Sequence, residues 1–270
     1  SVYDCWFLEH PELAAPVVRR AGAVLRRRVA AGAWIHTSSD ATTERAQELL
    51  ATDRVRTIAL GAPDVPSTDD LGAADRDPRP AVAGGVDGRP FVVCIATEER
   101  RKGIPLLVDA FAELVGRHDD VALVLAGASG DDSDAIADAI SRAGDAIAGR
   151  IHRLGAVDDG AKQWLVRHAA LLAYPSIDEG FGFPVLEAQA LGTPVVATGV
   201  GSVTEVAGDA AELVDGRDPA RFAAAIDRVL DDGVRRLDLI ESGYRNLARF
   251  RWETTAEQLT VLYRDAVADR

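Results

Sequence analysis

The sequence is short of the residues that signal a disulfide framework, a zinc cluster or a membrane span. Its two cysteines, Cys5 and Cys94, are too few for a disulfide framework and lack the paired spacing of a structural zinc site. We expect both thiols to be reduced and Cys94 to lie in the core. No apolar run is long enough to cross a bilayer, and the amino terminus lacks the pattern of a signal peptide. We therefore expect a cytoplasmic protein, either free or peripheral to the membrane.

Positive charge and methionine are also scarce. The formal net charge is -13 and the pI is about 4.8, which disfavours nucleic acid as a partner because such binding depends on clustered cations. Lys102 and Lys162 are the only lysines. There is no methionine at all, so we expect that Ser1 is not the natural start. What the chain does have is 47% hydrophobic residues over 270 positions, enough to bury a sizeable core.

After residue 90, short apolar runs alternate with amphipathic stretches. This alternation predicts an α/β fold in which a Rossmann-like, doubly wound parallel sheet is covered on both faces. Right-handed crossovers limit the topology further. The expected strands are 91–96, 121–127, 150–155, 170–176, 193–198 and 211–214. The expected helices are 104–116, 133–147, 159–168, 184–191 and 219–231.

The residues upstream predict part of a second Rossmann-like domain. We expect an arginine-rich helix over 11–30, strands over 33–38 and 55–60, and between them a helix capped by Ser39 or Asp40. About sixty residues are few for a complete α/β domain. We therefore predict four parts: an incomplete amino-terminal domain (1–61), a Pro- and Gly-rich linker (62–90), the main domain (91–250), and a carboxyl-terminal helix that packs back toward the amino-terminal part (251–270).

A basic loop, ATEERRKG at 96–103, follows the first strand of the main domain. In doubly wound sheets, ligands bind outside the carboxyl ends of the strands. The helix that follows has its positive end beside three cations, Arg100, Arg101 and Lys102, and this end of a helix disfavours positive charge. A bound phosphate would offset this unfavourable interaction. The alternative is a solvated basic turn balanced by Glu98 and Glu99, and this loop alone does not decide between the two.

A second loop, DEGFGFPVLEA at 178–188, follows the fourth expected strand. Pro184 suits the first turn of a helix, while Gly180 and Gly182 allow a tight turn whose amides approach a ligand. Glu179 and Glu187 would repel a phosphate, but carboxylates accept hydrogen bonds from vicinal hydroxyls such as those of a sugar. A sugar or nucleotide site is favoured over the alternative of an ordinary helix glutamate and a surface loop charge.

Other motifs are weaker. The loop TGVGSVTEV at 198–206 is a plausible second wall for the same site. The stretch DDSD at 131–134 could bind a divalent metal, but a helix cap explains it better. The chain lacks the three-glycine dinucleotide pattern, the Gly-Lys-Ser/Thr phosphate loop and a nucleophile elbow, which disfavours nicotinamide enzymes and hydrolases.

These stretches resemble the carboxyl-terminal, donor-binding domain of GT-B fold glycosyltransferases, in particular the retaining enzymes of family 4. The resemblance runs from about Phe91 to Val229 and rests on RKG at 101–103, PSIDEGFGFPVLEAQALGTPVVAT at 175–198 and EVAGDAAELVD at 205–215. Glu179 and Glu187 match the family's paired-acid signature with its seven intervening residues. The segment SVYDCWFLEHPELAAP resembles a family stretch that usually reads Val-His-Asp, with Tyr3 at the histidine position.

The resemblance implies hexosyl transfer from a nucleotide-diphosphate sugar to a hydroxyl acceptor, with retention and without a metal or other cofactor. Lys102, with Arg101 or Arg100, would neutralise the diphosphate, and Glu187 would bind the ribose hydroxyls. Glu179 and the loop Gly180, Phe181 and Gly182 would meet the donor sugar and its phosphate. Two further donor contacts would be Val157 near the base and Thr97, which stands where many relatives have an arginine or threonine.

Two alternatives remain open at this stage. The family's acceptor domain normally has roughly another hundred residues before this segment, the size of a small Rossmann half. The chain could therefore be a non-catalytic or split nucleotide-sugar binding module that needs a partner chain. The other alternative is an epimerase of the same fold that acts on a sugar nucleotide. Such an enzyme would need additional acids or histidines at the cleft, and the sequence offers no such set.

Overall fold

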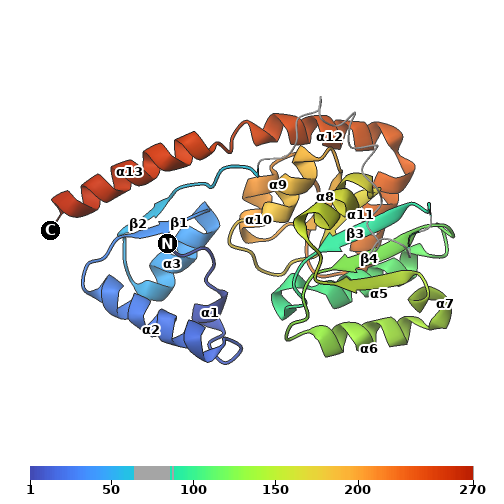
Figure 1. Ribbon diagram of the computed structural model, residues 1–270, viewed down its shortest axis with the longest axis horizontal. Coiled ribbons are helices and arrows are strands. Elements are labelled where there is room, and N and C mark those ends of the chain that lie inside the picture. The colour runs from blue at the N-terminus through green and yellow to red at the C-terminus, as the bar shows by residue number, and fades with distance from the viewer. Residues whose placement is uncertain (64–85, 87, 270) are drawn as a thin grey trace.

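The computed structural model describes residues 1–63, 86 and 88–269, which form two parallel sheets (Figure 1). The larger sheet has six strands in the order β5-β4-β3-β6-β7-β8. They are β3 (Phe91–Ile95), β4 (Ala122–Ala126), β5 (Ile151–Gly155), β6 (Leu171–Tyr174), β7 (Val195–Thr198) and β8 (Glu212–Val214). All neighbouring pairs are parallel. The predicted α/β class and doubly wound parallel sheet are confirmed.

The strand order places a topological switch point between β3 and β6. From β3 the chain winds outward through β4 to β5, and it then returns to the other side of β3 and winds through β6 and β7 to β8. The loops that follow β3 and β6 therefore leave the sheet in opposite directions. The crevice between such loops is where open α/β sheets bind their ligands.

Helices cover both faces of the large sheet. One face is covered by α5 (Ile104–Leu114), α6 (Ser133–Ala143) and α11 (Pro219–Asp231). The other face is covered by α8 (Asp159–His168), α9 (Phe183–Ala190) and α10 (Gly201–Ala207). In β3, Val92 and Cys94 join the first core and Val93 joins the second, because successive side chains of a strand point to opposite faces. This explains why the strand is apolar throughout.

Some expected helices differ from those observed. The helix expected over 133–147 divides into α6 and a short α7 (Asp145–Ala148), because Gly144 between them has a φ of 85°. Asp132 is the N-cap residue of α6 but its side chain makes no capping hydrogen bond. The glycine-rich loop expected over 198–206 contains α10, whose apolar residues are buried. Neither α10 nor α12 (Gly233–Leu247) was expected from the sequence.

The amino-terminal part is a smaller α/β unit. It contains α1 (Trp6–Glu9), α2 (Pro16–Ala30), β1 (Ile35–Thr37), α3 (Asp40–Leu50) and β2 (Val55–Thr57), with β1 and β2 parallel. Helix α2 begins at Pro16 rather than at residue 11, because proline suits the first turn. The amide of Thr42 donates to Ser39 Oγ at 3.1 Å, which confirms Ser39 as the cap of α3.

Helix α13 (Trp252–Ala268) runs along the amino-terminal part (Figure 1). Thr255 Oγ1 donates to the carbonyl of Ala59 at 2.7 Å, and Arg56 pairs with Asp265 at 2.9 Å. The expected linker, 62–90, lies mostly outside the described residues. Both cysteines are buried and free. Among the helices that the structure describes, none is both long and apolar enough for a transmembrane segment.

Candidate functional site

The loops after β3 and β6 are joined by their backbones at the switch point. The amide of Ile177 donates to the carbonyl of Arg101 at 2.7 Å. Gly103 packs so closely that an added Cβ would lie 2.3 Å from the carbonyl oxygen of Pro175, and its φ of 63° also favours glycine. The short 3-10 turn η2 (Arg100–Lys102) is thereby held against the loop that carries Glu179.

Two cations of η2 converge on one buried carboxylate. Lys102 Nζ lies 2.6 Å from Glu179 Oε1, and Arg101 Nη1 lies 3.2 Å from Glu179 Oε2. Ser176 Oγ also donates to Glu179 Oε1, at 2.7 Å. The side chains of Glu179, Lys102 and Arg101 are 6%, 11% and 20% exposed, so water screens this network only in part. The structure thus brings Arg101 and Lys102 together with Glu179, which lies 78 and 77 positions further along the chain.

This network lines a cavity of about 640 Å³. Gly180, Phe181 and Gly182 also line it, as does Tyr174 at the end of β6. The hydroxyl of Tyr174 is buried without a hydrogen-bond partner among the described residues, and burial together with the charge of Glu179 raises its pKa well above the ordinary value. Sequence reasoning missed Tyr174 because a tyrosine in an apolar strand is normally a core residue.

The two glutamates of the basic loop have different roles. Glu99 Oε2 accepts from Arg101 Nε at 2.7 Å, as expected for a balanced basic turn. Glu98 points elsewhere: it is buried and accepts from Arg153 Nη2 at 2.6 Å and from Ser133 Oγ at 2.5 Å. Burial alone would raise the pKa of Glu98, but these hydrogen bonds outweigh it and hold the pKa below its usual range. In the alternative of a solvated basic turn balanced by Glu98 and Glu99, only Glu99 therefore contacts the turn's cations.

Three of the expected donor contacts do not line the cavity. Arg100 is exposed and its guanidinium lies 4.0 Å from Asp131, which is not a lining residue of the cavity. Thr97 lies in the loop before η2, where its carbonyl accepts from the amide of Glu99 at 2.7 Å. Val157 packs against the second core cluster, in the loop between β5 and α8. Of the two arginines left open by the sequence, Arg101 is the one that reaches Glu179.

Glu187 is also outside the cavity lining. It lies in the second turn of α9, and Lys162 Nζ of α8 contacts its Oε1 at 2.8 Å. Burial would lower the pKa of Lys162, but the hydrogen bond and charge of Glu187 outweigh it, so this pKa is raised. The contact with Lys162 was not expected. Its only sequence signal was the scarcity of lysine in an arginine-rich chain.

The glycine loop is held by the amino-terminal part. The carbonyl of Gly180 accepts from Ser38 Oγ at 3.0 Å, Ser39 Oγ at 2.9 Å and Thr42 Oγ1 at 3.2 Å. An added Cβ at Gly180 would lie 1.4 Å from the carbonyl oxygen of Tyr3. The glycine is thus required by the close approach of the chain's own backbone. We call these three hydroxyls and the Gly180 carbonyl the hydroxyl clamp.

Further contacts hold the same loop. Arg45 Nη1 of α3 contacts Asp178 Oδ1 at 2.9 Å, and Ser202 Oγ donates to the carbonyl of Glu179 at 2.6 Å. Phe181 is buried and its ring packs edge-on against Phe183 and Phe250. The Phe181 ring therefore anchors the loop in an apolar cluster. Gly182, with a φ of 103°, then leads into α9.

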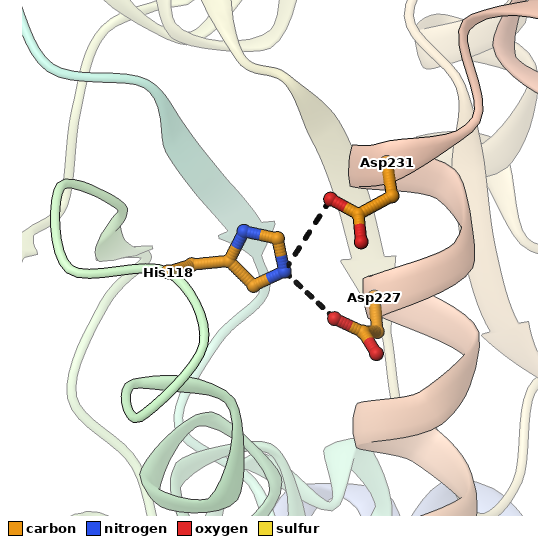
Figure 2. A group of neighbouring side chains, drawn as sticks. All are labelled: His118, Asp227 and Asp231. Carbon is orange, nitrogen blue, oxygen red and sulfur yellow. Dashed lines mark hydrogen bonds and ion pairs between the residues drawn. The ribbon is translucent and has the colours of Figure 1, made fainter.

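One group among the described residues has the ligand spacing of a metal site: His118, Asp227 and Asp231 (Figure 2). His118 Nε2 lies 2.7 Å from Asp227 Oδ1 and 3.9 Å from Asp231 Oδ1, and Arg117 Nε lies 3.3 Å from Asp227 Oδ2. His118 lies between α5 and β4, at the amino edge of the sheet and opposite to the cavity. Through the His118–Asp227 contact and the Arg117–Asp227 ion pair, the group joins the segment after α5 to α11.

Curated proteins of similar sequence match part of the chain. Among curated proteins, a D-inositol 3-phosphate glycosyltransferase from Acidothermus cellulolyticus is 46% identical over 106 residues, which are 38% of this chain and 23% of that protein. One from Corynebacterium kroppenstedtii is 34% identical over 183 residues, 65% of this chain and 40% of that protein. The chain thus spans less than half the length of these relatives.

Solved structures share the fold at low sequence identity. A sucrose-phosphate synthase from Thermosynechococcus elongatus superposes with a TM-score of 0.75 over 99% of this chain and 67% of its own, at 22% identity. A UDP-forming α,α-trehalose-phosphate synthase from Burkholderia xenovorans gives 0.76 over 94% of this chain and 67% of its own, at 15% identity. The two Rossmann-like parts therefore follow the GT-B fold. The sequence profile of the glycosyl transferases group 1 matches residues 75–246, which is more than half of the chain, and the chain belongs to that family.

Proposed function

We propose that this chain provides the donor site of a retaining hexosyltransferase, which moves a hexose from a nucleotide-diphosphate sugar to a hydroxyl acceptor. The observation that carries the proposal is the convergence of Lys102 and Arg101 on Glu179 at the switch point. The adjoining cavity, of about 640 Å³, has the size of a small-molecule site. Residues 91–250 would be the donor unit and residues 1–61 the remaining part of the acceptor side.

The chemistry of the two cations fits a diphosphate. Burial would lower the pKa of Arg101, but the charges of Glu179 and Glu99 outweigh it, so the pKa is raised and the guanidinium stays charged. Lys102 and Arg101 would bind the diphosphate and stabilise the charge that develops as it leaves. In the reaction, the bond from the anomeric carbon to the diphosphate breaks, a bond to the acceptor oxygen forms, and the acceptor proton passes to the departing phosphate. We propose that these two cations neutralise the diphosphate in place of a metal.

Glu179 has a double role in this proposal. A diphosphate that takes up Lys102 and Arg101 must compete with the carboxylate of Glu179, since all of these charges share one small space. Once the cations bind phosphate, Glu179 is free to accept hydrogen bonds from the hydroxyls of the donor sugar. Ser176 would keep the carboxylate in place, as it already donates to Oε1.

The nucleoside would extend along the neighbouring loops. We propose that Glu187 accepts the ribose hydroxyls and that Lys162 orients its carboxylate. Thr97, Val157 and the backbone from Gly180 to Gly182 would line the path of the base and of the phosphates. The structure leaves Arg100 directed at Asp131, so its share in donor binding would be small.

A thermal-shift screen of nucleotide-diphosphate sugars tests this function, followed by assay of the released nucleoside diphosphate with and without an acceptor. D-inositol 3-phosphate is the first acceptor to test, because the curated relatives are glycosyltransferases named for it. We expect one nucleotide sugar to raise the melting temperature. Binding without turnover would favour the alternative of a non-catalytic or split module, and no binding by any nucleotide sugar would contradict the donor site.

A further inference from the structure

Helix α2 differs in charge from the rest of the molecule. Over Pro16–Ala30 it carries five arginines and no acidic residue, in a chain of net charge -13. One of the five has a structural role: Arg26 Nη1 donates to the carbonyl of Leu49 at 2.9 Å and Arg26 Nη2 to that of Leu8 at 3.5 Å. The other four need a separate explanation.

Those four side chains are exposed and have no ion pair within the part of the chain that the structure describes. They are Arg19, Arg20, Arg27 and Arg28. Arg27 and Arg28 lie in the last turn, where the helix dipole favours cations. Arg19 and Arg20 lie near the start, where the dipole disfavours them. Helix stability therefore accounts for only half of this charge.

The outward face of α2 combines arginine with apolar side chains. Gly22 and Val29 are buried against the amino-terminal unit. On the opposite side, helical spacing aligns Val17, Arg20, Val24 and Arg27 in one stripe. Val17 and Val24 are 71% and 49% exposed. Figure 1 shows α2 along the outer edge of the amino-terminal part, across β1 and β2 from α13.

We propose that this face of α2 binds the anionic surface of a lipid bilayer. The arginines would contact lipid phosphates, and the two valines would reach the boundary between headgroups and acyl chains. A nucleic acid fits less well, because a polymer would extend beyond a helix of about 22 Å onto a surface of negative charge. Anionic lipids can instead gather beneath the helix alone. This proposal does not depend on the donor site.

Co-sedimentation of the chain with vesicles tests the proposal. We expect binding to vesicles that contain phosphatidylglycerol and phosphatidylcholine, loss of binding in high salt, and no binding to phosphatidylcholine alone. Each arginine near an anionic surface contributes about 1 kcal/mol, or roughly fivefold in partitioning. The triple variant Arg20→Glu, Arg27→Glu and Arg28→Glu should therefore bind on the order of a hundredfold more weakly.

A matched variant controls for net charge. Arg217→Glu, Arg245→Glu and Arg264→Glu change the charge equally but lie on exposed positions elsewhere in the chain. This control should bind vesicles as the parent chain does, and circular dichroism should show both variants folded. Equal loss of binding in the two variants, binding to phosphatidylcholine alone, or preference for an RNA at salt that releases the vesicles would overturn the proposal.

Discussion

Lys102 Nζ lies 2.6 Å from Glu179 Oε1, and this contact joins the loop after β3 to the loop after β6. The second lysine of the chain, Lys162, contacts the other signature glutamate, Glu187, at 2.8 Å. Both glutamates of the DEGFGFPVLEA stretch are thus engaged by a lysine. The pair of Lys102 and Glu179 lines the cavity, whereas the pair of Lys162 and Glu187 joins α8 to α9. We therefore expect substitutions of the two glutamates to affect ligand binding differently.

Removing the charge of Glu179 should separate phosphate binding from sugar transfer. Glu179→Gln no longer competes for Lys102 and Arg101, so we expect a bare nucleoside diphosphate to bind about three- to tenfold more tightly, since one weakened charge contact is worth ~1 kcal/mol. Transfer from the nucleotide sugar should fall at the same time. Calorimetry and a turnover assay measure the two effects, and weaker binding of the bare diphosphate would count against the competition described above.

Glu187→Gln tests the ribose contact. A carboxylate that accepts a hydrogen bond from a ribose hydroxyl contributes about 1.5 kcal/mol, so the chain should prefer a ribonucleoside diphosphate to its 2′-deoxy form by roughly tenfold. The variant should lose this preference. Lys162→Met should reduce the preference only through its effect on Glu187. The double variant Glu187→Gln, Lys162→Met should therefore show the same preference as Glu187→Gln alone. If the preference survives in Glu187→Gln, the carboxylate serves only the ion pair with Lys162.

The backbone of Tyr3 lies so close to Gly180 that the position of the amino-terminal segment should depend on a glycine at residue 180. Gly180→Ala has no room beside the backbone of Tyr3, so it should displace the segment and the hydroxyl clamp. We expect a loss of stability of about 2–4 kcal/mol and faster proteolysis within residues 1–10. Gly116→Ala is the matched control, because no atom lies within 4 Å of its added Cβ. Equal stability of the two variants would show that the close approach is absent.

Glu98 predicts a pH-dependent contribution to stability. Its pKa in the folded chain is depressed, so its stabilisation is present above the unfolded pKa and is lost as pH falls through the folded value. Glu98→Gln should reduce the free energy of unfolding by about 1–3 kcal/mol at pH 7. The difference from the parent chain should shrink as the pH falls below about 4. A difference that stays constant between pH 7 and pH 3 would mean that the charge of Glu98 is not the source.

The centre of the large sheet could be predicted because β3, β4, β6 and β7 are largely apolar on both faces, and buried strands of this kind are visible as short apolar runs. FVVCI is an example, with Val93 and Cys94 in opposite cores. The basic and glycine loops could be placed at one edge because both follow strands. The break at Gly144 was also visible in principle, since glycine readily adopts its positive φ.

Contacts between distant segments could not be predicted in the same way. Ser38 and Gly180 are 142 positions apart, and nothing in either local pattern indicates that a hydroxyl will meet that carbonyl. The direction of Glu98 in the basic loop depended on Arg153 of β5, 55 positions away. These contacts arise from the packing of complete elements, so local periodicity and motif spacing carry no signal for them.

The most direct test of the central claim is calorimetry of the best-binding nucleoside diphosphate with three variants of the basic loop. Lys102→Ala and Arg101→Ala each remove a cation that contacts Glu179, and each should weaken binding by at least about tenfold, because charge-assisted hydrogen bonds contribute about 1.5–3 kcal/mol. Arg100→Ala removes a neighbouring cation directed at Asp131 and should change affinity less than about twofold, as weakly coupled surface charges do. Unchanged affinity in Lys102→Ala and Arg101→Ala, with the fold intact, would contradict the donor site.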